Sequence, residues 1–143
     1  MLAEKQQQLV DRLTAPVIAR IQPYLAEIFP GSALRHGDKL DFTGLQSNNV
    51  EEDYAALSGG AQEQFSLMTR IGLAEVLAAE GRLPLVLDDS LVNSDADRIR
   101  QVHRALDRAS ERLQIIILTC HEPLFDELGA DYQKRLSPTR TRV

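Results

Sequence analysis

Lysine and cysteine are both scarce in this sequence: three of its 143 residues are lysine and one is cysteine. A single cysteine excludes an internal disulfide and fits a reducing compartment. Long apolar runs are also absent, and the N-terminus lacks the basic and apolar regions of a secretory signal. We therefore expect a cytoplasmic protein that makes no membrane contact.

Positive charge is in short supply as well. The formal net charge is −5 at pH 7, which argues against a chain that coats nucleic acid by itself. The length suits one domain with a modest core, and the hydrophobic content of 43% is that of a globular protein.

The first half of the sequence begins with a helical pattern. Apolar residues recur at helical spacing over residues 2–29, although Pro16 and Pro23 should break or kink the helix. Pro30 and Gly31 then end it. Residues 33–42 predict a short hairpin that turns at Gly37-Asp38, and the polar residues 46–53 predict a loop.

Strands and helices alternate in the second half, which predicts an α/β fold with a parallel sheet. Ser58 is a good N-cap for a helix that ends at Gly81, and a strand follows at residues 85–89. Another helix starts near Ser94. The apolar run 113–119 is typical of a strand covered on both faces.

The segment Ser58-Gly59-Gly60 is a candidate anion site. Unpaired N–H groups and the helix dipole attract negative charge at a helix start, and glycine lets a phosphate approach the backbone. The alternative is an ordinary capped helix whose glycines make a turn.

Acidic and histidine side chains end the two predicted parallel strands. Asp88 and Asp89 follow Leu85–Leu87, and His121 follows residues 115–120. Open parallel sheets place ligand crevices at these strand ends. One aspartate can hold Mg²⁺ while the next orients an attacking water, and the histidine can contact a phosphate. The alternative is a capping aspartate beside solvated side chains.

The remaining thiol and imidazole groups are weaker candidates. Cys120 precedes His121 directly, and adjacent side chains are poorly placed to share a proton, so we do not expect nucleophilic catalysis by this pair. His36 and His103 lack metal-ligand spacing, and we expect both on the surface.

Together these motifs resemble the C-terminal lobe of an ABC-type ATPase head of the SMC-like and recombination-repair group. Residues 57–62 resemble the signature motif, 83–89 the Walker B strand, 92–95 the D-loop and 119–121 the switch-histidine segment. The resemblance covers roughly residues 30–136. It implies a parallel-sheet half of a P-loop NTPase head, residues 30–143, preceded by the helical end of a coiled-coil arm, residues 1–29.

The resemblance also implies roles for single residues in the signature motif. Ser58 and Gly60 would contact the terminal phosphate of a nucleotide held by the opposite head, with Gly59 in the same segment. Gln62 would belong to this binding segment too. Its role stays open because Ala61 stands where many relatives carry glutamine.

The acidic and histidine positions take further roles by the same resemblance. Asp88 would organise Mg²⁺, and Asp89 occupies the place of the general base, where the family more often has glutamate. Asp95 would help communication across a dimer of heads. His121 would contact the γ-phosphate.

The phosphate-binding run Gly-x-x-x-x-Gly-Lys-Ser/Thr of such heads is absent from the sequence. We therefore expect ATP and Mg²⁺ to bind only after completion by an N-terminal phosphate-loop lobe, from the same gene or a separate chain. Further expected partners are a second head in an ATP-dependent dimer and, by resemblance alone, DNA in repair or chromosome maintenance.

Two other functions are open at this point. One is a non-catalytic interaction module that keeps the shape of the lobe, which the absent phosphate loop favours. The other is a metal-dependent nuclease that uses Asp88 with Asp95 and Asp97, although those two acids suit the first turn of a helix better.

Overall fold

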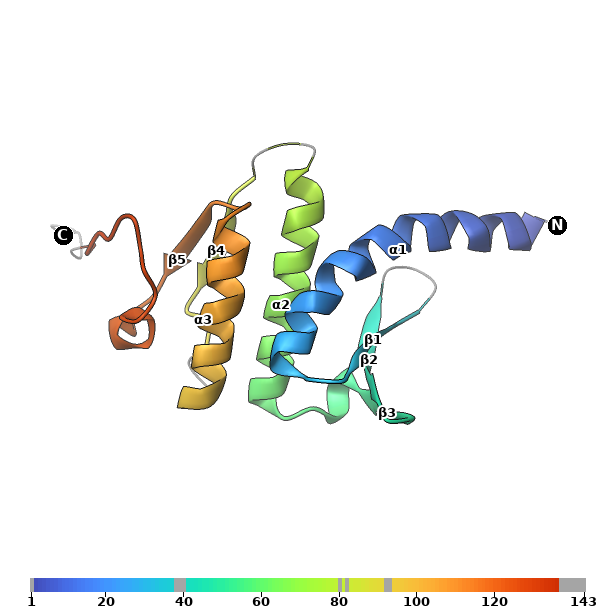
Figure 1. The fold of residues 1–143 in the computed structure, drawn as a ribbon, viewed down its shortest axis with the longest axis horizontal. Coiled ribbons are helices and arrows are strands. Elements are labelled where there is room, and N and C mark those ends of the chain that lie inside the picture. The colour runs from blue at the N-terminus through green and yellow to red at the C-terminus, as the bar shows by residue number, and fades with distance from the viewer. Residues whose placement is uncertain (1, 38–40, 80, 82, 92–93, 137–143) are drawn as a thin grey trace, which may run out of the picture.

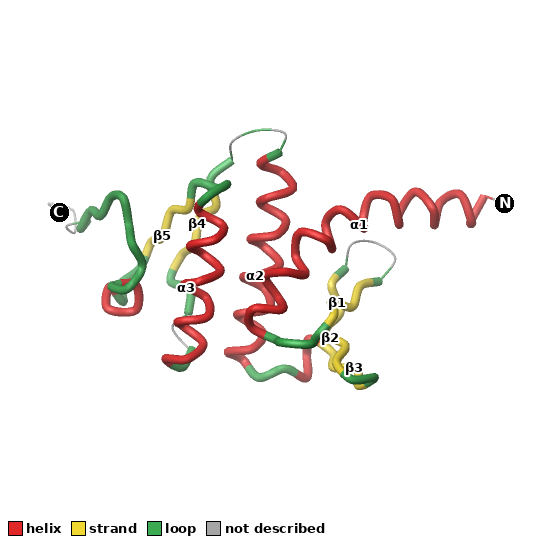
Figure 2. Tube along the Cα trace, viewed as in Figure 1, coloured by secondary structure: helices red, strands yellow, loops and turns green. Residues whose placement is uncertain are grey.

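The computed structural model describes residues 2–37, 41–79, 81, 83–91 and 94–136. Three long helices, an antiparallel sheet and a parallel strand pair make up the fold (Figures 1 and 2). The antiparallel sheet and the parallel pair lie on opposite sides of α2 (Figure 1). The α/β class and the parallel pair agree with the prediction.

Helix α1 (Leu2–Ile28) runs through both of its prolines. Of the two expected outcomes, a break does not occur, whereas a change of direction along α1 is visible in Figure 1. Each internal proline costs about 3 kcal/mol. Burial of each large aliphatic side chain contributes roughly 1.5–3 kcal/mol, and four of them, Val17, Ile21, Leu25 and Ile28, are buried in the core. Packing of the C-terminal half of α1 therefore outweighs the prolines.

The antiparallel sheet consists of β1 (Ala33–His36), β2 (Phe42–Ser47) and β3 (Val50–Asp53), paired in that order. The predicted first hairpin is confirmed, and Gly37 N–H donates to the Asp41 carbonyl at its base over 2.9 Å. Asp38, in the expected turn, lies outside the described residues.

The loop predicted at residues 46–53 is wrong, because this segment completes β2 and forms β3. Asn48 and Asn49 have φ angles of 48° and 62°, as a tight two-residue hairpin turn requires. All four residues of β3 are exposed, so the strand lacks the alternation of apolar residues that would identify it.

Helix α2 (Gly59–Ala78) follows a short 3₁₀ turn, η1 (Tyr54–Ala56), and carries the central part of the core. Its buried residues include the predicted stripe Phe65, Met68, Ile71, Gly72 and Glu75. The helix ends at Ala78, before the expected stop at Gly81. Its C-cap, Ala79, keeps right-handed helical angles, so no glycine is needed there.

The parallel pair is β4 (Leu85–Asp88) and β5 (Ile115–Leu118), joined by α3 (Ala96–Ser110). Leu85 and Leu87 face the helices and are buried. The other face is open: Val86, Ile116 and Leu118 are 42%, 39% and 44% exposed. The expectation that residues 113–119 are covered on both faces is therefore wrong for this chain, since no layer of the described residues covers the second face.

A buried carboxylate ties the three long helices together. Glu75 on α2 accepts a hydrogen bond from Tyr24 Oη on α1 and one from Arg112 Nη1, which follows α3, over 3.3 Å. Arg20 Nη1 lies 3.6 Å away. Burial beside this carboxylate raises the pKa of Tyr24. The C-terminal half of α1 thus belongs to the same core as the lobe that follows it.

No helix among the described residues is long and apolar enough to cross a membrane.

Candidate functional site

The polar residues predicted for the site lie at one edge of the molecule. The strands β4 and β5 end there, and α2 and α3 begin there (lower part of Figure 1). Asp89 N–H continues the strand pairing by donating to the Leu118 carbonyl over 2.8 Å. This pairing places Asp89 beside the segment that follows β5.

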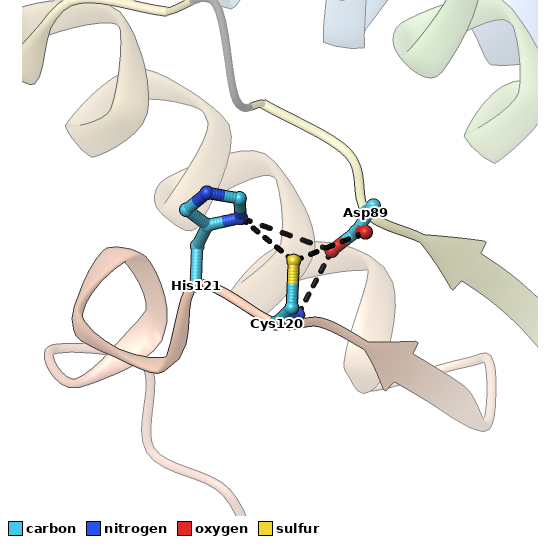
Figure 3. A group of neighbouring side chains, drawn as sticks. All are labelled: Asp89, Cys120 and His121. Atoms are coloured by element: carbon cyan, nitrogen blue, oxygen red, sulfur yellow. Dashed lines mark hydrogen bonds and ion pairs between the residues drawn. The ribbon is translucent and has the colours of Figure 1, made fainter.

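Asp89, Cys120 and His121 form a compact cluster in which the side chains point toward one another (Figure 3). Asp89 accepts from the Cys120 N–H over 2.9 Å and from the Cys120 thiol over 3.3 Å. Cys120 Sγ lies 3.2 Å from His121 Nδ1, and His121 Nδ1 lies 3.9 Å from Asp89 Oδ1. All three residues are exposed.

The contact between Cys120 and His121 corrects the sequence-based expectation about adjacent side chains. His121 has φ −114° and ψ 61°, outside the strand region, so the alternation of side chains ends before it. Its N–H donates to Thr119 Oγ1 over 2.9 Å. The turned backbone lets the imidazole face the thiol.

Hydrogen bonding sets the acidity of two members of the cluster. The Cys120 N–H and then the Cys120 thiol stabilise the Asp89 carboxylate and lower its pKa. The same carboxylate raises the pKa of the Cys120 thiol, because it accepts the thiol proton and repels a thiolate. Both shifts favour the same protonation state, in which the Asp89 carboxylate is ionised and the Cys120 thiol keeps its proton.

Asp88 and Asp89 take different positions, as predicted for consecutive residues at a strand end. Asp88 is the last residue of β4 and is exposed. Asp89 has φ 43°, a left-handed angle that aspartate tolerates better than most residues. The left-handed turn aims Asp89 at the β5 side of the pair.

The start of α2 has the expected capped geometry. Ser58 Oγ accepts from the Ala61 N–H over 3.3 Å, and both Ser58 and Gly59 are exposed. A Cβ at Gly59 would meet no atom within 4 Å, so open space lies beside this backbone. Gly60 is half-buried.

Gln62 is engaged inside the chain. Its side-chain Nε2 donates to the carbonyls of Tyr54 and Leu57, each over 3.1 Å. These bonds hold η1 against the first turn of α2.

Glu63 is a site residue that sequence reasoning missed. Its Oε1 accepts from the Leu91 N–H over 2.6 Å, and this bond ties the N-terminal part of α2 to the loop after β4. Leu91 is buried and has φ 74°, an uncommon angle for a branched residue. Nothing local in the sequence marks Glu63, because its partner lies 28 residues away.

Asp95 and Asp97 both serve the start of α3. Asp95 is its N-cap and accepts from the Arg98 N–H over 2.9 Å, and Asp97 pairs with Arg100. The interpretation as acids of the first turn is confirmed. Residues 92–93 of the expected D-loop lie outside the described residues.

The two other histidines differ. His36 is exposed, as predicted. His103 on α3 is buried, and its ring centroid lies 6.0 Å from that of Phe125. The prediction that His103 lies on the surface is therefore wrong.

Comparison with solved structures identifies the fold. The SMC head domain from Thermotoga maritima superposes with a TM-score of 0.61 at 21% identity, over 84% of this chain and 44% of that one. The chain has the fold of part of an SMC head. The Smc head domain with an extended coiled coil from Pyrococcus furiosus, solved bound to the C-terminal domain of ScpA, gives 0.61 at 16% identity. That match covers 85% of this chain and 32% of the other.

Sequence relatives are more similar over a shorter stretch. Uncharacterized protein Rv1278 of Mycobacterium tuberculosis is 36% identical over 67 residues, which are 47% of this chain and 8% of that protein. Uncharacterized protein YhaN of Bacillus subtilis is 39% identical over 71 residues, 49% of this chain and 7% of that protein. The chain thus matches less than a tenth of the length of these curated relatives. No protein-family model matches it.

Proposed function

We propose that this chain is the C-terminal half of an SMC-like ATPase head and that it hydrolyses ATP once a phosphate-loop lobe completes it. The observation that carries this proposal is that the strand ends bearing Asp88, Asp89 and His121 lie at the same edge of the fold as the capped start of α2. Open parallel sheets bind their ligands at this edge.

The start of α2 fits an incoming phosphate. Ser58 and Gly59 are exposed, open space lies beside Gly59, and the amides of a helix start favour negative charge. In the proposal, Ser58, Gly59 and Gly60 contact the nucleotide held by a second head. Gln62 contributes by holding η1 in place.

The acidic strand end fits Mg²⁺, which prefers carboxylate and water ligands. Asp88 is exposed and would hold the ion. Asp89 would orient the attacking water, and its lowered pKa keeps it ionised, so that it can accept a hydrogen bond from that water. His121 would contact the γ-phosphate, and Asp95 would act in communication between heads.

The open face of the parallel pair supports a partner lobe. Parallel sheets are normally covered on both faces, yet Val86, Ile116 and Leu118 remain exposed. An N-terminal phosphate-loop lobe would cover this face and bring the lysine and backbone amides that grip the phosphates.

The structural neighbours favour an assembly of heads. One solved neighbour, at 16% identity and a TM-score of 0.60, comes from work on the ATP-driven dimerization and DNA stimulated activation of SMC ATPases. For this chain we propose the same kind of head dimer. A role on DNA, in repair or chromosome maintenance, is the extension of that proposal.

The test is complementation. A candidate N-terminal lobe with a phosphate loop is mixed with this chain, and ATP hydrolysis is measured. Activity should require both parts, and Asp89→Asn should lower kcat by about 10²–10⁴-fold, the usual contribution of a general base. The matched control is Asp97→Asn, an exposed acid at the start of α3, which should leave kcat within twofold, or about 0.4 kcal/mol.

An unchanged kcat of ATP hydrolysis in Asp89→Asn would contradict the proposal. A stable complex of the two parts without any hydrolysis would instead favour the second candidate, a non-catalytic interaction module. The open apolar face of the parallel pair is the observation that suits such a module.

A further inference from the structure

The cluster of Asp89, Cys120 and His121 combines a carboxylate oxygen, a sulfur and an imidazole nitrogen. These three ligand atoms all lie within 4.8 Å of one another. Mg²⁺ takes oxygen ligands, whereas sulfur together with imidazole selects softer ions such as Zn²⁺. The donor set therefore differs from the one that ATP hydrolysis requires.

The separations of the ligand atoms suit a tetrahedral ion. Bonds of about 2.0–2.3 Å to zinc keep its ligand atoms about 3.3–3.6 Å apart. Here Sγ to Nδ1 is 3.2 Å, Sγ to Asp89 Oδ2 is 3.3 Å, and Nδ1 to Asp89 Oδ1 is 3.9 Å. The last two distances involve different oxygens of the Asp89 carboxylate, so this side chain would rotate to bring one oxygen to an ion held by Sγ and Nδ1.

The backbone holds these ligands in place without an ion. Asp89 is fixed by its own N–H bond to Leu118 and by the Cys120 N–H bond to its Oδ1. The Thr119 hydroxyl holds the N–H of His121. Asp89 and His121 are 49% and 48% exposed, which leaves a path for the ion and room for water as its fourth ligand.

We propose that Asp89, Cys120 and His121 form a Zn²⁺ site at the end of the parallel strand pair. The ion binds Asp89 through a carboxylate oxygen, Cys120 through its thiolate and His121 through Nδ1. Zinc displaces the thiol proton, which leaves to solvent, so one proton is released for each ion bound. Three protein ligands and one water make an open zinc site, in contrast to the closed four-ligand sites that serve structure.

A regulatory consequence follows if the proposed ATPase function also holds. Zinc would occupy Asp89 and His121, the two side chains assigned to water activation and phosphate contact. The ion would then inhibit the assembled head. Binding of zinc to this chain alone does not depend on that function.

The experiment is a metal titration of the reduced 143-residue chain, free of any affinity tag. Calorimetry should show one Zn²⁺ per chain, with proton release that depends on the buffer. Co²⁺ should produce a thiolate charge-transfer absorption that Zn²⁺ then removes. Millimolar Mg²⁺ should leave both signals unchanged.

Variants locate the site. Cys120→Ser and His121→Ala should each weaken zinc binding at least about tenfold, or 1.4 kcal/mol. His36→Ala, which removes an exposed histidine from β1, should leave the affinity unchanged. Because Cys120 is the single cysteine, zinc should also slow its alkylation by iodoacetamide.

Zinc affinity that is unchanged in Cys120→Ser, or Co²⁺ binding without thiolate absorption, would overturn the proposed site. In either case ATP hydrolysis by the assembled head would remain a separate question. Inhibition by zinc that Cys120→Ser relieves, with hydrolysis in the absence of zinc retained, would support both the site and its regulatory consequence.

Discussion

Asp89 accepts two hydrogen bonds from one neighbouring residue, and this shared contact links the acidity of a carboxylate to that of a thiol. The backbone N–H of Cys120 is the larger influence on Asp89, and the thiol comes second. Asp89 in turn is the main reason for the raised pKa of Cys120. Changing either side chain should therefore alter the titration of the other.

The prediction at this scale concerns Asp89→Asn and Cys120→Ala. Asp89→Asn removes the negative charge beside the thiol, so the pKa of Cys120 should fall and alkylation at pH 8 should accelerate. Cys120→Ala should raise the pKa of Asp89, which should still stay below its usual value because the backbone N–H remains. Alkylation rates against pH and carboxyl NMR shifts measure the two effects. An unchanged thiol pKa in Asp89→Asn would contradict the linkage.

The pH dependence of stability follows from the direction of the Asp89 shift. A carboxyl group whose pKa is lowered by folding stabilises the native state above its unfolded pKa. That contribution disappears as the pH falls through the lower, folded pKa. Because the pKa of Asp89 is lowered, the effect on the free energy of unfolding is confined to acidic pH. The effect is also small, because the surrounding water screens this exposed group.

At the scale of the elements, the contact between α1 and α2 depends on a glycine. A Cβ at Gly72 would lie 2.5 Å from Ile21 Cγ1 and 2.6 Å from Ile21 Cα. The second distance involves backbone, which cannot move aside as a flexible side chain does. Only glycine lets the two helices approach this closely.

Gly72→Ala should therefore destabilise the chain by about 1–3 kcal/mol through overpacking. The matched control is Gly59→Ala in the first turn of the same helix, where a Cβ meets nothing within 4 Å. The control should change the free energy of unfolding by less than about 1 kcal/mol, because alanine favours a helix over glycine. Urea unfolding followed by circular dichroism measures both, and equal stabilities of the two variants would refute the close contact.

Local signals predicted some elements well and others poorly. The cap at Ser58 and the stripe through Phe65 and Glu75 identify α2, because a helix carries its start signal and its buried face in its own residues. The exposed β3 carries no such pattern, and α1 survives its prolines only because distant residues of α2 bury it. Likewise, Asp89 and His121 could be assigned to one site from their strand ends, whereas the bond between Glu63 and Leu91 could not.

For the molecule as a whole, the parallel pair is unusual because one of its faces carries no covering layer within the described residues. Leu85 and Leu87 pack on the helices, while Val86, Ile116 and Leu118 stand on the opposite face with about 40% exposure. Contiguous apolar surface of this kind marks an interaction site. The same face bears Asp88 at its end, so a partner bound there would also reach the candidate site.

The corresponding prediction uses a polar version of this face, Val86→Thr with Ile116→Thr. The two substitutions should abolish complementation by an N-terminal lobe, because burial of each lost aliphatic side chain contributes roughly 1.5–3 kcal/mol to an interface. They should leave the circular dichroism spectrum of the chain unchanged, since both side chains are partly exposed and lie outside the core. Val50→Thr on β3 is the control, an exposed valine on the other sheet, and should bind the lobe normally. If the double variant still binds the lobe with unchanged affinity in calorimetry, the lobe docks elsewhere, and the open face belongs to a different contact such as a second copy of this chain.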